Sequence, residues 1–247
     1  PIKILIDPYN FNNYYKNYFN FFNIDNINKN KYKNLLNQIK VANFLCNKTG
    51  LDLITMPIDK SLFKKKISFI GMTEHLAEIN KTKTIMLLYG NNFSVIPLTT
   101  HINIKDVHNF IKDKKIKPML NFLLKTLKGS HDLNFKIIKF LCYNPHCGEN
   151  KTLGNEDYDI KKTLRLFKNI KGPFPADSSF SNFIKKTLFI ATYHDQALIP
   201  FKALNNKMIN ITLGLKYRRL SPAHGTAKDI KFRNKANISS YIECMKI

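Results

Sequence analysis

Short apolar runs alternate with segments of helical periodicity along most of the chain. The apolar runs predict strands at residues 2–7, 51–56, 84–89, 94–98, 135–143, 187–192 and 208–212. Apolar residues at helical spacing predict helices at residues 31–46, 104–114, 118–128, 155–167 and 238–245. This alternation favours an α/β architecture around a largely parallel sheet.

Turn residues mark the ends of several predicted elements. The helix at 31–46 is followed by Gly50, a residue typical of the position just past a helix end. The sequence Gly-Asn-Asn at 90–92 predicts a tight turn between the strands at 84–89 and 94–98. Residues 10–33, rich in Asn and aromatic side chains, predict an irregular loop. No linker separates independent domains, so residues 1–247 are expected to fold as one unit.

The chain is strongly basic, and its charge raises the question of nucleic-acid binding. The formal net charge is +23, from 40 Lys and Arg against 17 Asp and Glu. Only four of the 40 cations are Arg, whereas base recognition draws on bidentate Arg contacts. The Lys residues are spread along the whole chain, which is typical of a solvated surface. We therefore expect no nucleic-acid partner, although the positive field would attract phosphorylated small molecules.

Cysteine usage and hydropathy indicate the compartment. The four cysteines show neither paired metal spacing nor a disulfide framework, which favours reduced thiols in a cytoplasmic setting. No apolar run approaches the roughly 20 residues of a membrane helix, so no membrane span is expected. The first residues read as a strand and not as a secretion signal. Because no initiating Met is present, we expect the chain to be trimmed or partial at this end.

Three histidines each lie just beyond a predicted strand, namely His101, His146 and His194. In α/β sheets, ligands gather at the carboxyl ends of strands. Imidazole is a common ligand of Zn²⁺, and three protein ligands leave positions open for a substrate. A single histidine at such a place is more often only hydrogen-bonded. The spacing alone therefore leaves both interpretations open.

Four blocks of residues carry a resemblance to a known family. Segment 144–149 (Asn-Pro-His-Cys-Gly-Glu) resembles the Asn-Pro-His-Ala-Gly-Glu segment of 4-hydroxythreonine-4-phosphate dehydrogenases. Segments 172–177 (Gly-Pro-Phe-Pro-Ala-Asp), 193–198 (Tyr-His-Asp-Gln-Ala-Leu) and 210–215 (Asn-Ile-Thr-Leu-Gly-Leu) are similar to further motifs of that family. The order and number of these blocks extend the resemblance from about residue 38 to residue 247.

The resemblance implies an α/β fold similar to that of isocitrate and isopropylmalate dehydrogenases. In such a fold the active-site cleft lies between two α/β subdomains, expected here at residues 1–60 with 201–247 and at residues 61–200. The resemblance also implies a homodimer whose two chains share the metal ligands.

The implied activity is the oxidation of a phosphorylated amino acid in the synthesis of vitamin B6. NAD would oxidise 4-phosphohydroxy-L-threonine to a 3-keto acid, which decarboxylates to 3-amino-2-oxopropyl phosphate. By family position, the ligands of a divalent metal (Zn²⁺, Mg²⁺ or Co²⁺) are His101, His146 and His194. The substrate-contacting positions are Thr73, Lys202, Asn210 and Arg219.

The chemistry of these side chains fits the implied reaction. A divalent cation lowers the pKa of a bound hydroxyl and stabilises the alkoxide from which hydride leaves. Lys202 and Arg219 can bind the phosphate and carboxylate of the substrate, although without the motifs both would read as solvated surface charges. Together with Lys202, Asp177 and Asp195 are the candidates for catalysis. These two carboxylates either orient ligands and move protons, or only form turns and caps.

The cofactor prediction rests on a separate segment. The chain lacks the Gly-x-Gly-x-x-Gly fingerprint of a Rossmann domain. Segment 224–230 (His-Gly-Thr-Ala-Lys-Asp-Ile) instead resembles the adenosine-binding loop of isocitrate and isopropylmalate dehydrogenases. The resemblance assigns NAD, or alternatively NADP, to His224, Gly225, Thr226 and Asn237. Without it, the segment reads as an ordinary turn before a helix.

The sequence departs from the family pattern at three points. Met72 replaces the His of a Gly-His-Thr-Glu motif, and a thioether neither carries charge nor donates a strong hydrogen bond. Ala223 replaces the acid of an Asp-His-Gly-Thr motif, and the family's glycine-rich opening segment has no counterpart. Two alternatives therefore stay open. One is a dehydrogenase of phosphorylated threonate or erythronate, and the other is a catalytically weakened relative with a binding role.

Overall fold

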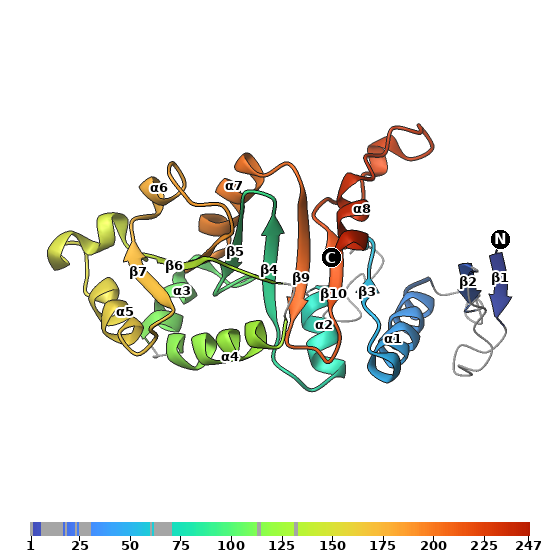
Figure 1. The fold of residues 1–247 in the computed structure, drawn as a ribbon, viewed down its shortest axis with the longest axis horizontal. Coiled ribbons are helices and arrows are strands. Elements are labelled where there is room, and N and C mark those ends of the chain that lie inside the picture. The colour runs from blue at the N-terminus through green and yellow to red at the C-terminus, as the bar shows by residue number, and fades with distance from the viewer. Residues whose placement is uncertain are drawn as a thin grey trace.

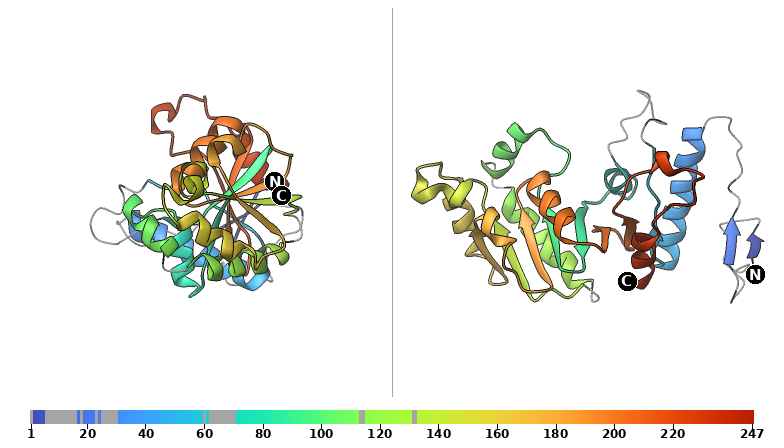
Figure 2. Two further views of the ribbon diagram at one scale, coloured as in Figure 1. Left: turned by 90° about the vertical axis from the view of Figure 1, so that its left-hand side faces the viewer. Right: turned by 90° about the horizontal axis from the view of Figure 1, so that it is seen from above.

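A mixed sheet with helices on both faces forms the body of the protein (Figures 1 and 2). A computed structural model describes residues 2–5, 17, 19–22, 24, 31–59, 61, 71–112, 115–130 and 133–247. Within these residues the sheet has eight strands. In spatial order they are β3 (Leu53–Ile54), β10 (Arg219–Pro222), β9 (Met208–Leu213), β4 (Ile85–Gly90), β5 (Phe93–Pro97), β8 (Thr187–Ala191), β6 (Ile137–Leu141) and β7 (Ile170–Phe174).

The strand directions correct the expectation of a largely parallel sheet. The pairs β10–β9, β9–β4 and β4–β5 are antiparallel, whereas β3–β10, β5–β8, β8–β6 and β6–β7 are parallel. Short connections explain two of the reversals, because the predicted turn at 90–92 joins β4 to β5 and residues 214–218 join β9 to β10. A parallel pair would need a crossover of roughly a dozen residues or more.

The helices follow the predicted periodicity at five places. The predictions for 31–46, 104–114, 118–128, 155–167 and 238–245 are confirmed as α1 (Lys31–Thr49), α3 (Ile104–Lys112), α4 (Ile116–Lys128), α5 (Glu156–Leu164) and α8 (Ser239–Lys246). Residues 113 and 114 of the second prediction lie outside the described residues. None of the helices in the described residues has the length and apolar character of a bilayer span.

Several further elements were not predicted. They are α2 (Met72–Ile79), α6 (Ala176–Ser179), α7 (His194–Leu204), the strands β7 and β10, and the 3₁₀ helices η3 (Pro145–Lys151) and η4 (Lys228–Ile230). Their local patterns are weak for physical reasons. α7 contains Pro200, and β10 is a strand whose buried positions include Arg219 and Ser221. Neither element shows the apolar periodicity that indicates a helix or strand.

Two apolar cores lie on opposite faces of the sheet. Neighbouring residues of one strand alternate between them: Leu87 belongs to the core with α3, α4 and α5, and Leu88 to the core with α7. This alternation is the period of two that a strand imposes on its side chains. Figure 1 shows α4 and α5 below the sheet and α6 and α7 above it. On its face of the sheet α7 contacts β5 and β8, and α8 contacts β9 and β10.

The first residues form a separate small sheet. The strand predicted at 2–7 is confirmed over β1 (Ile2–Leu5), and residues 6 and 7 lie outside the described residues. β1 pairs in parallel with β2 (Phe19–Phe22). The prediction of an irregular loop over residues 10–33 is therefore wrong at β2, where aromatic and Asn residues form a strand. Most of that stretch lies outside the described residues.

Candidate active site

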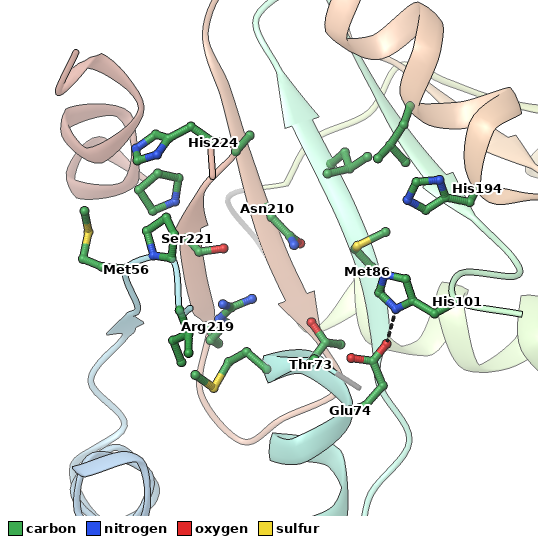
Figure 3. A pocket seen from close by; sticks show the side chains of 18 of the residues that line it. Met56, Thr73, Glu74, Met86, His101, His194, Asn210, Arg219, Ser221 and His224 are labelled. Atoms are coloured by element: carbon green, nitrogen blue, oxygen red, sulfur yellow. Dashed lines mark hydrogen bonds and ion pairs between the residues drawn. The ribbon is translucent and has the colours of Figure 1, made fainter. Parts of the chain in front are cut away.

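A cavity of about 300 Å³ lies where β4, β9 and β10 meet the first turn of α2 and helix α7 (Figure 3). Residues far apart in the sequence reach it because the central strands bring their ends together. Of the residues predicted for the site, those that line it are Thr73, His101, His194, Lys202, Asn210, Arg219 and His224.

Two of the predicted metal ligands face each other across one end of this cavity. The ring centroids of His101 and His194 are 5.9 Å apart. The Nδ1 atom of His101 lies 3.1 Å from Oε1 of Glu74, and that of His194 lies 2.6 Å from Oδ1 of Asp195. Because a carboxylate occupies each Nδ1, the Nε2 atoms are left to bind a ligand.

Arg219 forms the opposite, cationic end of the cavity. Its side chain is only 5% exposed, and burial lowers its pKa to about 10, so it stays charged at neutral pH. It donates hydrogen bonds from Nε and Nη2 to Oγ1 of Thr55, at 2.9 and 2.5 Å. Among the described residues no carboxylate lies within ion-pair distance of it. A buried cation that meets only hydroxyl groups is well suited to an incoming anion.

Polar atoms between these two ends are available to a bound molecule. The Oδ1 atom of Asn210 is buried, and in the described part of the chain nothing donates a hydrogen bond to it. Thr73 Oγ1 lies 3.2 Å from Thr212 Oγ1, and Lys202 is an exposed residue of α7 at the rim. Asn210 can accept a hydrogen bond, and Lys202 can add positive charge.

His146, the third predicted ligand, does not line this cavity. It is exposed in η3, a turn in which residues 146–150 all have positive φ angles between 41° and 79°. Left-handed backbone costs non-glycine residues about 1–2 kcal/mol each, so neighbouring contacts must hold the turn. No three His, Cys, Asp or Glu side chains of one chain gather into a metal site within the described ranges.

Asp157 supports the chain just before this turn, a role that the sequence did not reveal. The residue is 2% exposed, and its carboxylate accepts backbone N–H bonds from Tyr143 and Asn144 at 2.7 and 2.8 Å. Burial raises its pKa, although these hydrogen bonds oppose the rise. An Asp at the first turn of a helix reads as an ordinary dipole-stabilising residue, so its position in the sequence carries no signal of this contact.

Gln196 and Glu74 were also missed, although both lie in segments that resemble family motifs. Gln196 accepts hydrogen bonds from the backbone N–H and hydroxyl of Thr192 and donates one to the Cys142 carbonyl at 2.8 Å. It thereby fixes the start of α7, which carries His194, to the ends of β8 and β6. The motif positions were the available signal, because residue type alone does not distinguish these side chains from surface amides and acids.

The predicted cofactor segment lies next to the main cavity. A second cavity of about 480 Å³ shares Met56, Pro57 and His224 with it and is lined by the segment that includes Gly225 and Thr226. A Cβ atom added to Gly225 would meet nothing within 4 Å, so the backbone there is open to a ligand. Asn237 does not line either cavity, and its Oδ1 accepts the backbone N–H of Ser239 at the start of α8.

The remaining candidates for catalysis are the two aspartates. Asp195 contacts His194 directly, and its side chain is 68% exposed. Asp177 is exposed in the first turn of α6 and does not line the main cavity. Their catalytic roles stay predictions.

Comparisons with known proteins agree with the motifs. The family model of the pyridoxal phosphate biosynthetic protein PdxA matches residues 9–247. A 4-hydroxythreonine-4-phosphate dehydrogenase of Aquifex aeolicus is 37% identical over 203 residues, which cover 79% of this chain and 63% of the relative. The protein of the same description from Hydrogenobaculum sp. is 38% identical over 191 residues, covering 76% of this chain and 61% of the relative. The chain thus spans less than two thirds of the length of these relatives.

Solved structures agree on the fold. The crystal structure of 4-hydroxythreonine-4-phosphate dehydrogenase from Klebsiella pneumoniae has a TM-score of 0.78 to this chain, at 24% identity, over 99% of this chain and 82% of that one. The predicted α/β fold and the resemblance found in the motifs are both confirmed. Since the family model covers nearly the whole sequence, the chain belongs to the PdxA family of pyridoxal phosphate biosynthetic proteins.

Proposed function

We propose that this protein is an NAD-dependent dehydrogenase of 4-phosphohydroxy-L-threonine. The reaction removes a hydride from the carbon that carries the 3-hydroxyl group and a proton from its oxygen, which leaves a ketone. The 3-keto acid then loses CO₂ and gives 3-amino-2-oxopropyl phosphate, a precursor of pyridoxal phosphate. The observation that carries this proposal is one cavity with paired imidazoles at one end and, at the other, a buried cation that has no carboxylate partner among the described residues.

The cationic side chains and the open acceptor support a phosphorylated amino acid as substrate. Arg219 is charged, buried and hydrogen-bonded to hydroxyls. An anionic group of the substrate would compensate its guanidinium for the hydration that it loses on burial. Lys202 adds a second charge at the rim, which suits a molecule with both a phosphate and a carboxylate. Asn210 Oδ1 receives no hydrogen bond from the residues that the structure describes, and it can accept one from a substrate N–H or O–H group next to Thr73.

His101 and His194 suit a divalent cation. Both rings have Nδ1 against a carboxylate, which is the arrangement that orients metal-binding imidazoles in proteins. We assign them as ligands, with His146 of a second copy as the third, because His146 does not reach the cavity of its own chain. Zn²⁺, Mg²⁺ or Co²⁺ bound there would lower the pKa of the substrate hydroxyl and stabilise negative charge on its oxygen.

Lys202, Asp195 and Asp177 are given separate roles around the proton that leaves the hydroxyl group. Lys202 lines the cavity and can hold or accept a proton beside the substrate. Asp195 keeps the His194 ring oriented through its contact with Nδ1. Asp177, which precedes both residues in the sequence and lies in α6, is the candidate for proton transfer to solvent.

NAD, with NADP as the alternative, is assigned to the cavity beside the site. Gly225 leaves open space at the backbone, and His224 belongs to both cavities, so a nucleotide bound there would point toward the substrate. Thr226 lines the same space. Asn237 would have to exchange its bond to the Ser239 amide for one to an adenine edge.

The assignment of the three imidazoles has a consequence for how the chains of this protein assemble. A homodimer is proposed because the third imidazole has to come from a second copy. The division into subdomains at residues 1–60 with 201–247 and at residues 61–200 puts the cavity near their junction, since its lining residues come from both. Four free cysteines in the described residues agree with a cytoplasmic location.

A catalytically weakened relative is the second candidate, and one observation favours it. Met72 and Ala223, the two replacements of family residues, both line the cavity. A thioether and a methyl group can neither donate a strong hydrogen bond to a substrate nor hold a charge beside it. Reduced turnover with retained binding is what these two changes predict if the second candidate is right.

An assay of NAD reduction tests the proposal. The purified protein is mixed with 4-phosphohydroxy-L-threonine or with 4-phosphothreonate, each with and without a chelator. Reduction with the amino-acid substrate that stops on chelation and returns with added Zn²⁺ is the expected result. The variant His146→Ala should lose this activity by at least about a hundredfold while keeping its secondary structure. Turnover only of the threonate ester identifies the sugar-acid dehydrogenase instead, and binding without turnover identifies the weakened relative.

A further inference from the structure

The cavity carries one acid among many bases. Among the described residues that line it, the basic side chains are His101, His194, Lys202, Arg219 and His224, and the single carboxylate is that of Glu74. An acid in a pocket for a phosphorylated substrate repels that substrate and weakens the field of the cations. A carboxylate kept in this place therefore needs a role that offsets its cost.

The contact of Glu74 identifies this role. Its Oε1 lies 3.1 Å from Nδ1 of His101, as the dashed line in Figure 3 shows. The two residues are 27 positions apart, so the contact joins the first turn of α2 to the segment that follows β5. Glu74 is not an ion-pair partner of Arg219 in the described residues, and it favours the charged guanidinium only at longer range. Its direct partner is the histidine.

A glycine makes room for this contact. A Cβ atom built on Gly71 would come within 2.5 Å of Oε2 of Glu74 and would lie 4.0 Å from Cε1 of His101. The backbone of Gly71 is extended, with φ at −173°, which any residue adopts, so its conformation does not demand glycine. Space for the carboxylate is the reason that the structure offers. A side chain at this position would push the flexible end of Glu74 aside, away from its place beside His101.

The same helical turn also reaches the substrate end of the cavity. Thr73 precedes Glu74, and its hydroxyl lies 3.2 Å from that of Thr212, which in turn lies 3.5 Å from Nη1 of Arg219. The first turn of α2 therefore contacts both ends of the cavity with adjacent residues. The carboxylate partner of His194 does not join distant segments in this way, because Asp195 is the next residue in sequence. Its side chain is also more exposed than that of Glu74.

We propose that Glu74 is a positioning residue. Its carboxylate accepts a hydrogen bond from Nδ1–H of His101 and so directs the Nε2 lone pair of that ring into the cavity. This inference rests on the proposed function, in which His101 binds a divalent cation. A carboxylate on the far nitrogen fixes the tautomer and ring orientation and makes the imidazole a stronger donor to a cation.

The affinity for Zn²⁺ alone tests the proposal, measured by competition with a chromogenic chelator on the purified protein without substrate. Loss of the carboxylate in Glu74→Ala should weaken Zn²⁺ binding by about 10–100-fold. Glu74→Gln keeps an oxygen that accepts the Nδ1 proton, so it should retain most of the affinity. Glu78→Gln, an exposed acid on the same helix, is the matched control and should stay within about twofold of the unmodified chain.

Kinetics separate positioning from loss of folding. Excess Zn²⁺ should restore turnover in Glu74→Ala, because the ring is still present and only its orientation is less fixed. If Glu74→Ala does not fold, Glu74→Gln and Glu74→Asp carry the test, and Gln should bind Zn²⁺ more tightly than Asp because Asp is too short to reach Nδ1. If every folded Glu74 variant binds Zn²⁺ as tightly as the unmodified chain does, the positioning role of Glu74 is wrong, while the proposed function still stands. An unmodified dimer that binds no Zn²⁺ would instead overturn the proposed function, and this inference with it.

Discussion

Arg219 shows how a single residue can be unfavourable for folding and suited to binding. The residue is 5% exposed, its hydrogen bonds go to the hydroxyls of Thr55 and Thr212, and burial lowers its pKa to about 10. Desolvating a charge without a countercharge costs several kcal/mol, which a bound anion can offset. The folded chain without ligand therefore holds an incomplete ion pair.

Replacing this cation should separate stability from binding. We expect Arg219→Met to leave the free energy of unfolding unchanged or to raise it by about 1–4 kcal/mol, since a buried charge is lost and packing is kept. Inorganic phosphate should raise the melting temperature of the unmodified chain and not that of the variant. Chemical denaturation and thermal melts with and without phosphate measure both effects.

Arg165→Met is the control for this experiment, because Arg165 is exposed and its charge is solvated. It should alter neither the stability nor the response to phosphate. A loss of more than about 3 kcal/mol in Arg219→Met, together with unchanged stabilisation by phosphate, would show that Arg219 is a structural residue.

At the scale of elements, the connection from β6 through η3 to α5 combines strained backbone with supporting hydrogen bonds. Its left-handed turn carries His146, and two acids of the first turn of α5 hold the chain in front of it. Asp157 accepts two backbone N–H groups, while Glu156 accepts the side-chain amide of Asn144 at 2.9 Å and faces Nδ1 of His108 at 3.3 Å. The position of a predicted metal ligand thus depends on carboxylates ten and eleven residues away.

Acid should loosen this connection. Burial alone would raise the pKa of Glu156, but hydrogen bonds from its own backbone N–H and from Asn144, with the positive charges of His108 and Lys112, lower it below the ordinary 4.5. A carboxyl whose pKa is lowered on folding contributes stability above its unfolded pKa and loses it as the pH falls through the folded value. The contribution of Glu156 should therefore be complete at pH 7 and disappear progressively below pH 4.5.

The variant Glu156→Gln measures this contribution, because it keeps an acceptor for Asn144 and removes the charge. The unfolding free energy of the unmodified chain should exceed that of the variant at neutral pH, and the difference should shrink in acid. A difference that stays constant from neutral pH to well below 4.5 would contradict a role for the charge.

At the scale of the whole molecule, the three predicted metal ligands lie in two separate places. His101 and His194 share one cavity, and His146 of the same chain is not part of its lining. A homodimer in which each chain lends His146 to the other would complete the three ligands. Activity would then belong to the pair of chains and not to either chain alone.

Mixing two inactive variants tests this arrangement. His101→Ala and His146→Ala should each be inactive alone. A mixed dimer has one damaged site with both substitutions and one intact site, so an equal mixture after subunit exchange should recover about a quarter of the unmodified activity. Assays of NAD reduction before and after exchange measure the recovery. A mixture that stays inactive while exchange is demonstrated would show that each chain supplies its own three ligands.

Much of this protein was predictable from the sequence by itself. Apolar periodicity located five of the helices and the hairpin of β4 and β5, because burial of one face imposes its period on the residues. The motifs selected His101, His194, Asn210 and Arg219, which all line one cavity. Elements with buried polar residues escaped prediction; β10 places Arg219 and Ser221 inside the molecule, against the usual pattern.

Only the tertiary structure decided which residues meet. The mixed directions of the sheet, the left-handed turn at His146, and the supporting contacts of Glu74, Asp157 and Gln196 depend on pairs far apart or on strained backbone. Periodicity reports which face of an element is buried but not which partner buries it. The sequence alone determined the family and the chemical groups at its disposal. The packing of distant segments determined that two cations, three imidazoles and one carboxylate share a single cavity.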